Sequence, residues 1–511
     1  MLSNKLTFQI TAIGILVFSI CGYIPAQKTG ADKDVLAKFE KSIEQKNYAA
    51  IERDLLDYAI ANPQDAKAFE LLGRLRFEQN RLSEAKSLYQ KALSLDANSA
   101  SAKINLAVIN FQTGNAAQAV SELNEIADRD VSNGALRLKL AQAFALVGDC
   151  GKALSNVEKL DAKIKNADAL PLRAECYLQS GEKNKAISLI IPAKNLAKQN
   201  PAATIKFAEV LSAGVLHKES ADVLRAVVAI APNDYDALVS LATSEIYTKD
   251  FANAKIHLQR ASKIKPNSPE LLYAEGLLES ERGNQAQSLE LLEKSLAANP
   301  DSEAVLSQFV ITAMRANQAG KALRAAEKLL ALKPNEPEFL YLHGAAALQN
   351  NNLRAAENSL NRFVKSRPQD SRGCLALGLT FAGQTGKIEE ARRQLKKCVE
   401  TNPNNFEANY QLGLSYKTQG ETEKAIEHLE ATIKSAPDYA LALRDLGAIY
   451  LQSGAEAKAR IALEKSAAIN PNDADTHFQL TRLYNLIGEK DLAKKHLEMF
   501  QKLKKPDKNG M

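Results

Sequence analysis

Proline recurs along the C-terminal half of this 511-residue chain at an almost constant interval. The steps are 34 residues, with a single step of 35, and the prolines are Pro232, Pro266, Pro300, Pro334, Pro368, Pro403, Pro437 and Pro471. Proline cannot continue a helix interior, and it pushes the residue before it towards an extended backbone. Asn or Asp follows most of these prolines and can cap a new helix. The spacing therefore predicts a tandem repeat of a short helical unit.

Other residues recur in the same register. In the unit that begins at Phe406, positions 7, 8, 11 and 20 are Leu412, Gly413, Tyr416 and Ala425, and the unit from Ala440 has Leu446, Gly447, Tyr450 and Ala459 there. Apolar residues at positions 4, 7, 11, 24 and 28 give each helix one apolar face. Small residues at 8, 20 and 27 allow two antiparallel helices to approach closely. One such hairpin cannot bury its apolar face alone, so neighbouring units must stack.

This pattern resembles the tetratricopeptide repeat (TPR) family. The departure is position 4, commonly Trp in the family, which is here Phe69, Leu238, Leu272, Leu306, Leu340 or His477. Units that begin at Ala66 and Ala474 are twelve steps of 34 residues apart, and a degenerate unit precedes them. The resemblance implies an all-α, right-handed superhelical solenoid of about 13–14 antiparallel helix-turn-helix units.

The N-terminal segment has the features of an export signal. Lys5 precedes an apolar run, Ala12–Ile20, and a cut after Ala26 fits the small-residue rule. Two alternatives stay open: Leu6–Ile24 is retained as a membrane anchor, or Cys21 carries a lipid. We expect an exported protein, periplasmic or at the cell surface, with the membrane involved only through a retained anchor.

Five segments follow from these patterns. They are a signal peptide or anchor (1–26), a polar leader (27–33), a degenerate first repeat (34–65), the repeat solenoid (66–504) and a disordered basic tail (505–511). The net charge of +6 is small for this length, and Lys and Arg are spread along the chain. A nucleic-acid surface needs a basic stripe or patch. We therefore expect no nucleic-acid partner.

No arrangement of residues in the sequence indicates catalysis. It contains no Gly-rich phosphate loop, HExxH, CxxC or nucleophile elbow. The six histidines are dispersed, and the adjacent Glu389 and Glu390 would point in different directions from a helix. We predict a protein that is not an enzyme and that has no catalytic residue, metal site or cofactor.

Four cysteines fall at positions that bring them together in pairs. Cys374 and Cys398 occupy facing positions in the two helices of one unit, and Cys150 and Cys176 lie on adjoining helices of neighbouring units. In an oxidising compartment each pair could form a disulfide. The alternative is four buried thiols that act as small apolar residues.

The resemblance also implies where a partner binds, because the first helix of each TPR unit lines a concave groove through positions 2, 5, 9, 12 and 13. Position 5 carries an aromatic residue in every second unit of the C-terminal half. The groove candidates are Tyr273, Tyr341, Tyr410 and Phe478, with the neighbouring Leu277, Leu348, Leu379 and Leu414 and the carboxylates Glu270, Glu338 and Glu407. An aromatic groove edged with carboxylates suits an extended peptide or a partner helix with basic residues. Alternatively, the tyrosines only cover the seams between repeats.

The expected function is a non-catalytic scaffold that binds a peptide or protein partner outside the cytoplasm. Two other classes stay open. One is an accessory subunit that presents substrates to an envelope enzyme or to secretion or polysaccharide machinery. The other is a glycan-binding solenoid.

Overall fold

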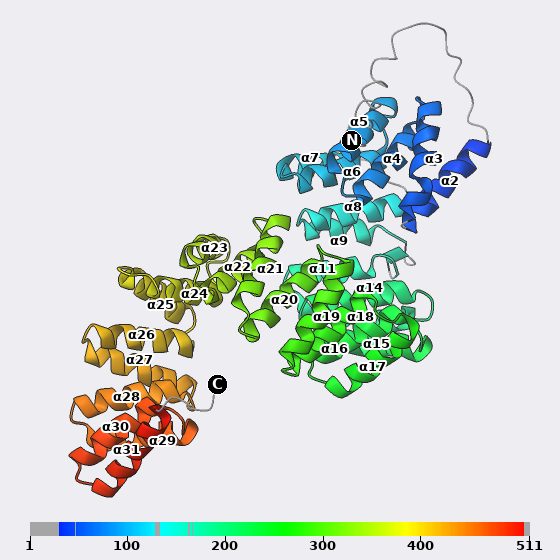
Figure 1. Ribbon diagram of the computed structural model, residues 1–511. Helices are drawn as coiled ribbons and strands as arrows, with labels where there is room; N and C mark the ends of the chain where they lie inside the picture. The colour runs from blue at the N-terminus through cyan, green and yellow to red at the C-terminus, as the bar shows by residue number, and fades with distance from the viewer. Residues whose placement is uncertain (1–29, 46, 128–132, 162–163, 166, 505–511) are drawn as a thin grey trace. The chain divides into compact units, whose positions relative to one another are not determined.

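The computed structural model describes residues 30–45, 47–127, 133–161, 164–165 and 167–504. The chain forms two compact units, Met1–Pro232 and Asn233–Met511. Within the described residues every regular element is a helix, and the helices pair as hairpins (Figure 1). The expected all-α helix-turn-helix fold is confirmed.

The helices of the first unit run in chain order along its described residues. They are α2 (Gly30–Glu44), α3 (Tyr48–Ala61), α4 (Ala66–Glu78), α5 (Leu82–Leu95), α6 (Ala100–Gln112), α7 (Ala116–Ala127), α8 (Gly134–Leu146), α9 (Cys150–Glu158), α11 (Leu170–Gln179), α12 (Lys183–Ser188), α13 (Ile190–Leu196), α14 (Pro201–Ala213) and α15 (His217–Ile230).

The second unit is more regular. Its helices are α16 (Tyr235–Tyr247), α17 (Phe251–Ile264), α18 (Pro269–Glu281), α19 (Gln285–Ala298), α20 (Glu303–Arg315), α21 (Ala319–Leu332), α22 (Pro337–Gln349), α23 (Leu353–Ser366), α24 (Ser371–Ala382), α25 (Ile388–Thr401), α26 (Phe406–Thr418), α27 (Thr422–Ser435), α28 (Ala440–Gln452), α29 (Glu456–Ile469), α30 (Ala474–Leu486) and α31 (Lys490–Lys504). Each even-numbered helix is the first helix of a hairpin and also contacts the next even-numbered helix along most of the unit.

The hairpin of α26 and α27 shows how the sequence specifies each repeat. The Asn405 side chain caps α26 by accepting a hydrogen bond from the Ala408 backbone N–H. Gly420 has a φ of +77° in the turn between the helices, a conformation that glycine adopts without strain. Ala425 and Leu429 are fully buried between the helices. The residues expected to cap, turn and pack therefore do so.

Glycine at position 8 is required by the close approach of the two helices. A Cβ added at Gly447 would lie 2.6 Å from Cγ of Leu463, and one at Gly413 would lie 2.8 Å from Cγ of Leu429. In both hairpins the leucine is at position 24 of the same repeat. The second helix thus packs its leucine directly over the backbone of the first.

A polar contact inside several hairpins was not expected from the sequence. The residue at position 23 of the repeat, which lies on the second helix, contacts a polar side chain of the first helix. The pairs are Asn110 Nδ2 with Glu122 Oε1 (3.1 Å), Glu245 Oε2 with His257 Nδ1 (2.8 Å), Asn409 Oδ1 with His428 Nδ1 (2.9 Å) and His477 Nδ1 with His496 Nδ1 (2.8 Å). His257, His428 and His496 are half-buried in these contacts.

The repeat pattern is weakest where the second helix of one hairpin is broken. Leu189 separates α12 from α13, and Pro192 lies in the first turn of α13. Proline has no backbone N–H to donate to the carbonyl of Ser188, four residues earlier, and its ring clashes with that carbonyl. The sequence between α11 and α14 therefore does not form one continuous second helix.

Both ends of the chain include residues outside the described ranges. The signal or anchor (1–26), residues 27–29 of the leader and the tail (505–511) lie outside the described residues. α2 begins at Gly30, within the segment expected as a polar leader. Of the helices that the structure describes, none has the length and apolar character needed to cross a bilayer.

Candidate functional site

A cavity of about 400 Å³ lies on the second unit, and we call it the Tyr341 pocket. Its lining comes from four consecutive first helices, α20, α22, α24 and α26, and from no second helix. The lining residues are Met314, Tyr341, Ala345, Leu348, Gln349, Arg372, Leu375, Ala376, Leu379 and Glu407. The pocket therefore belongs to the face that the repeat register predicts for partner binding.

Arg372 organises one side of the pocket. Its Nη1 and Nη2 donate to the two carboxylate oxygens of Glu338 at 3.0 and 2.9 Å, across the seam between α22 and α24. Its Nε and Nη2 also donate to Asp370, at 3.1 and 2.8 Å. These hydrogen bonds raise the pKa of the guanidinium. The bonds to Asp370 contribute most, followed by those to Glu338. Both ends of the guanidinium fork are therefore engaged by carboxylates.

Tyr341 packs beneath this guanidinium. The central carbon of the Arg372 fork lies 4.5 Å from the Tyr341 ring centroid, close enough for a cation–π contact. The ring also contacts Phe363 of α23 at a centroid distance of 5.4 Å. Burial raises the pKa of the Tyr341 hydroxyl, so it stays protonated at neutral pH. The ring is held from two sides, which gives the pocket a preformed wall.

Glu407 lines the pocket from the first turn of α26. Its side chain is exposed and makes no hydrogen bond or ion pair with any other residue that the structure describes. Position 2 of the preceding repeat is Arg372, but this cation pairs with Glu338, which is position 2 of the repeat before that. The pocket thus has one neutralised edge and one free carboxylate.

The other groove candidates are placed differently. Leu348 and Leu379 line the pocket with Tyr341, whereas Leu277 is buried, with 1% of its surface exposed. Leu414 is half-buried and packs against the C-terminal core. Glu270 is exposed outside the pocket lining.

Tyr410 is buried in a seam between repeats rather than presented at a surface. Its hydroxyl donates to Asp445 Oδ2 at 3.0 Å, and burial raises its pKa. Lys417 and Arg444 also donate to the Asp445 carboxylate, at 2.7 and 3.2 Å. This network joins α26 to α28. For Tyr410, the contacts correspond to the alternative in which the tyrosine covers a seam.

The remaining aromatic candidates lie at two other places on the unit. Tyr273 is half-buried and shares a hydrogen bond with Tyr247 of α16. Phe478 has 41% of its surface exposed, and its ring packs against Phe500 of α31 at 5.3 Å. The structure therefore brings Tyr341, Leu348, Leu379 and Glu407 together and leaves Tyr273 and Phe478 apart from them.

Sequence reasoning missed Arg372, which contacts Glu338, Asp370 and the Tyr341 ring at this site. The signal was present, because Arg372 occupies position 2, between Glu338 and Glu407 in the same register. Leu375 and Ala345 were also missed, although they occupy groove positions 5 and 9.

The two cysteine pairs differ in the structure. Cys374 and Cys398 form a disulfide between α24 and α25, with Cα atoms 5.6 Å apart. Cys150 and Cys176 are buried free thiols, and the Cys150 Sγ donates to Gln179 Oε1 at 3.2 Å. Burial raises the pKa of both thiols, so neither is a reactive thiolate at neutral pH.

Comparison with known families decides the identity of the repeat. Tetratricopeptide repeat models match residues 47–100, 308–371 and 410–474, and a second such model matches 76–143. A further model described as TPR repeat matches 384–420. The chain belongs to the tetratricopeptide repeat family. The matches fall in both compact units, as the repeat register predicts.

Two characterised proteins resemble this chain at low identity. Anaphase-promoting complex subunit 3 of Schizosaccharomyces pombe is 24% identical over 201 residues, which cover 39% of this chain and 29% of that protein. Cellulose synthase operon protein C of Pseudomonas fluorescens is 23% identical over 458 residues, or 82% of this chain and 35% of that protein. This chain therefore spans about a third of either relative's length.

Among solved structures, the APC/C hetero-tetramer Cut9–Hcn1 contains a similar chain. It matches with a TM-score of 0.45 and 14% identity, over 90% of this chain and 95% of that chain.

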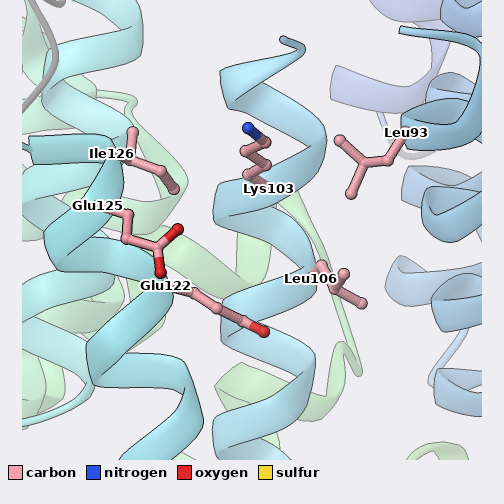
Figure 2. A pocket seen from close by; sticks show the side chains of 6 residues that line it. All are labelled: Leu93, Lys103, Leu106, Glu122, Glu125 and Ile126. Carbon is pink, nitrogen blue, oxygen red and sulfur yellow. The ribbon is translucent and has the colours of Figure 1, made fainter. Parts of the chain in front are cut away.

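A second cavity, of about 190 Å³, lies in the first unit between α5, α6 and α7. Its lining is Leu93, Lys103, Leu106, Glu122, Glu125 and Ile126 (Figure 2). Lys103 occupies position 4 of its repeat, where TPR units commonly have tryptophan, and its thin chain fills less space than an indole ring.

The described residues contain no group of three or more His, Cys, Asp or Glu side chains that could hold a metal ion.

Proposed function

We propose that this TPR protein is a non-catalytic scaffold that binds a peptide segment of a partner protein in the Tyr341 pocket. TPR membership supports a role in protein–protein interaction. The observation that carries the finer proposal is the pocket itself, an apolar cavity built only from first helices of the second unit.

The geometry suits recognition of a large side chain. The pocket volume of about 400 Å³ lies within the range of ligand sites, roughly 300–1,000 Å³. Leu348, Leu375 and Leu379 supply an apolar floor, and the Arg372 and Phe363 contacts hold the Tyr341 ring in place. A preformed pocket loses little conformational freedom on binding, which favours affinity.

We also propose that the protein works outside the cytoplasm. The apolar segment Ala12–Ile20 and the small residue Ala26 support export. The Cys374–Cys398 disulfide supports the same location, because structural disulfides persist in oxidising compartments. Cell fractionation of the tagged full-length protein tests this, and recovery in the cytosolic fraction would contradict it.

Filling the pocket tests the binding proposal. Ala345→Trp places a ring in the cavity, and Ala331→Trp on the exposed face of α21 is the matched control. Peptides selected by the full chain from a random phage-displayed library should bind Ala345→Trp at least about tenfold more weakly, because a blocked anchor pocket removes a binding hot spot. The control should bind as the wild type does, in a fluorescence anisotropy titration. Equal binding to both variants would place the interface elsewhere, and circular dichroism would verify that both fold.

A second candidate is an accessory subunit of a polysaccharide-synthesising machinery. It is favoured by the similarity to cellulose synthase operon protein C, which extends over 82% of this chain. Binding of cello-oligosaccharides that Ala345→Trp does not weaken, together with failure to select any peptide, would favour this candidate.

A further inference from the structure

We propose that the Tyr341 pocket selects partner segments in which an apolar side chain lies next to a lysine or arginine, with the Glu407 carboxylate pairing with the cation. This inference rests on the proposed function, that the pocket binds a peptide. It adds the chemistry of that peptide and the residue that reads it.

The positive charge of Arg372 is already balanced by two carboxylates. Its guanidinium makes a two-bond contact with Glu338 and further hydrogen bonds with Asp370. Paired forks of this kind are the stronger class of ion pair. One Nη1 hydrogen remains unused, but a partner carboxylate that accepted it would be the third carboxylate around a single cation. Arg372 is therefore part of the pocket wall and does not act as an anion receptor.

Carboxylates outnumber cations around the pocket. Arg372 contributes one positive charge, and Glu338, Asp370 and Glu407 contribute three negative ones. Arg367, which also acts on Asp370, adds a second positive charge and leaves a net charge of −1. Of the three carboxylates, Glu407 alone has no hydrogen bond or ion pair within the described chain. An acidic segment is repelled by this group, and a basic one is attracted.

The free carboxylate of Glu407 lies beside the apolar floor of the pocket. Glu407 lines the same cavity as Leu375 and Leu379, from the next first helix along the unit. A bound segment that places an apolar side chain over the leucines brings its neighbouring residue to the edge formed by α26. A cation at that edge pairs with Glu407, which has no ion pair in the free protein. This pairing fixes the direction of the bound segment along the helices.

Exposed ion pairs are weak, so the expected effect is modest and depends on salt. Replacing Glu407 by an uncharged isostere should weaken binding of a basic–apolar peptide by about three- to tenfold at low salt. The difference should shrink as the ionic strength rises, because the Debye length falls to about 8 Å at 0.15 M.

The test uses the full chain and a random peptide library displayed on phage. Wild-type protein should enrich peptides that pair an apolar residue with Lys or Arg. Glu407→Lys should instead enrich acidic peptides. Synthetic copies of the wild-type hits should bind Glu407→Gln about three- to tenfold more weakly, whereas Glu423→Gln, a charge loss on the exposed face of α27, should bind as the wild type does.

The outcomes separate this inference from the proposed function. Hits without a cation, or equal binding to wild type and Glu407→Gln, would overturn the inference, and the pocket would still stand if Ala345→Trp abolished binding. Hits insensitive to both substitutions would overturn both proposals. No enrichment on wild type over Ala345→Trp would also overturn both.

Discussion

Half-buried histidines connect the stability of individual hairpins to pH. Burial lowers the pKa of His343, His428 and His496, because the charged imidazolium loses its hydration inside the hairpin. His343 lies 2.8 Å from Ser359 Oγ, and His428 stacks on the Tyr416 ring at 5.5 Å. The neutral forms fit these sites.

The sign of the pH effect follows from the direction of these pKa shifts. A histidine whose pKa is lower in the folded state binds fewer protons there than in the unfolded chain. The stability that it contributes is fully present above the unfolded pKa of about 6.5 and is lost as the pH falls below that value. We expect the melting temperature to fall by several degrees between about pH 7.5 and pH 5.5, measured by circular dichroism.

A matched substitution identifies the source of this effect. His428→Gln keeps a polar group near Asn409 and removes one titrating ring, so its melting temperature should depend less on pH over the same range. A melting temperature that stays constant or rises on acidification would contradict the prediction. Carboxylates with lowered pKa values, such as Asp370 and Glu464, lose their contribution at lower pH, below about 4.

At the scale of the helix hairpin, packing distance decides which glycines are indispensable. Gly447→Ala should destabilise the protein, because its Cβ would lie 2.6 Å from Leu463 Cγ and 3.4 Å from the Ala459 carbonyl oxygen. Overpacking typically costs about 1–3 kcal/mol. Gly320→Ala is the matched control, since its nearest neighbours lie at 3.8 Å or beyond and the helix gains up to about 1 kcal/mol.

Urea unfolding followed by circular dichroism should therefore move the two variants in opposite directions. Because alanine favours a helix at both sites, the difference between them measures the cost of the clash in α28. A Gly447→Ala variant as stable as Gly320→Ala would show that α29 can shift outward without loss.

The Cys374–Cys398 disulfide also stabilises one hairpin. It joins α24 to α25 across 24 residues of sequence, a loop whose closure is worth about 3 kcal/mol in the chain-entropy account. We expect Cys374→Ser/Cys398→Ser to unfold at a lower temperature than the wild type. In unreduced, denatured protein the variant and the wild type should give the same thiol count, because Cys374 and Cys398 contribute none. Two additional thiols in the wild type would contradict the disulfide.

At the scale of the whole molecule, stability is distributed over many local contacts. Each hairpin packs on its sequence neighbours, and each compact unit has its own buried clusters, such as the one around Phe309 and Leu329 and the one around Leu55 and Tyr89. In such arrays the stability is close to a sum of repeat and interface terms, so unfolding need not be a single transition. A pocket that spans four consecutive first helices therefore requires that the adjoining repeats stay folded together.

The sequence by itself determined the repeat and its register. The prolines mark the helix boundaries, and α26, α28 and α30 begin at the residues assigned to position 1, Phe406, Ala440 and Ala474. Gly447 and Ala425 lie where two helices touch, as their size predicts. These features are predictable because caps, turns and close contacts within a hairpin depend on residues that are near in sequence.

Only the tertiary structure decided which residues of that register form a site. Tyr341 and Tyr410 share position 5, yet the first lines a pocket and the second is buried against Asp445. Arg372 pairs with Glu338, one repeat back, and leaves Glu407 without a cation. The physical reason is that contacts between repeats join residues about 34 positions apart, and each depends on the particular side chains of two neighbouring units rather than on the period that they share.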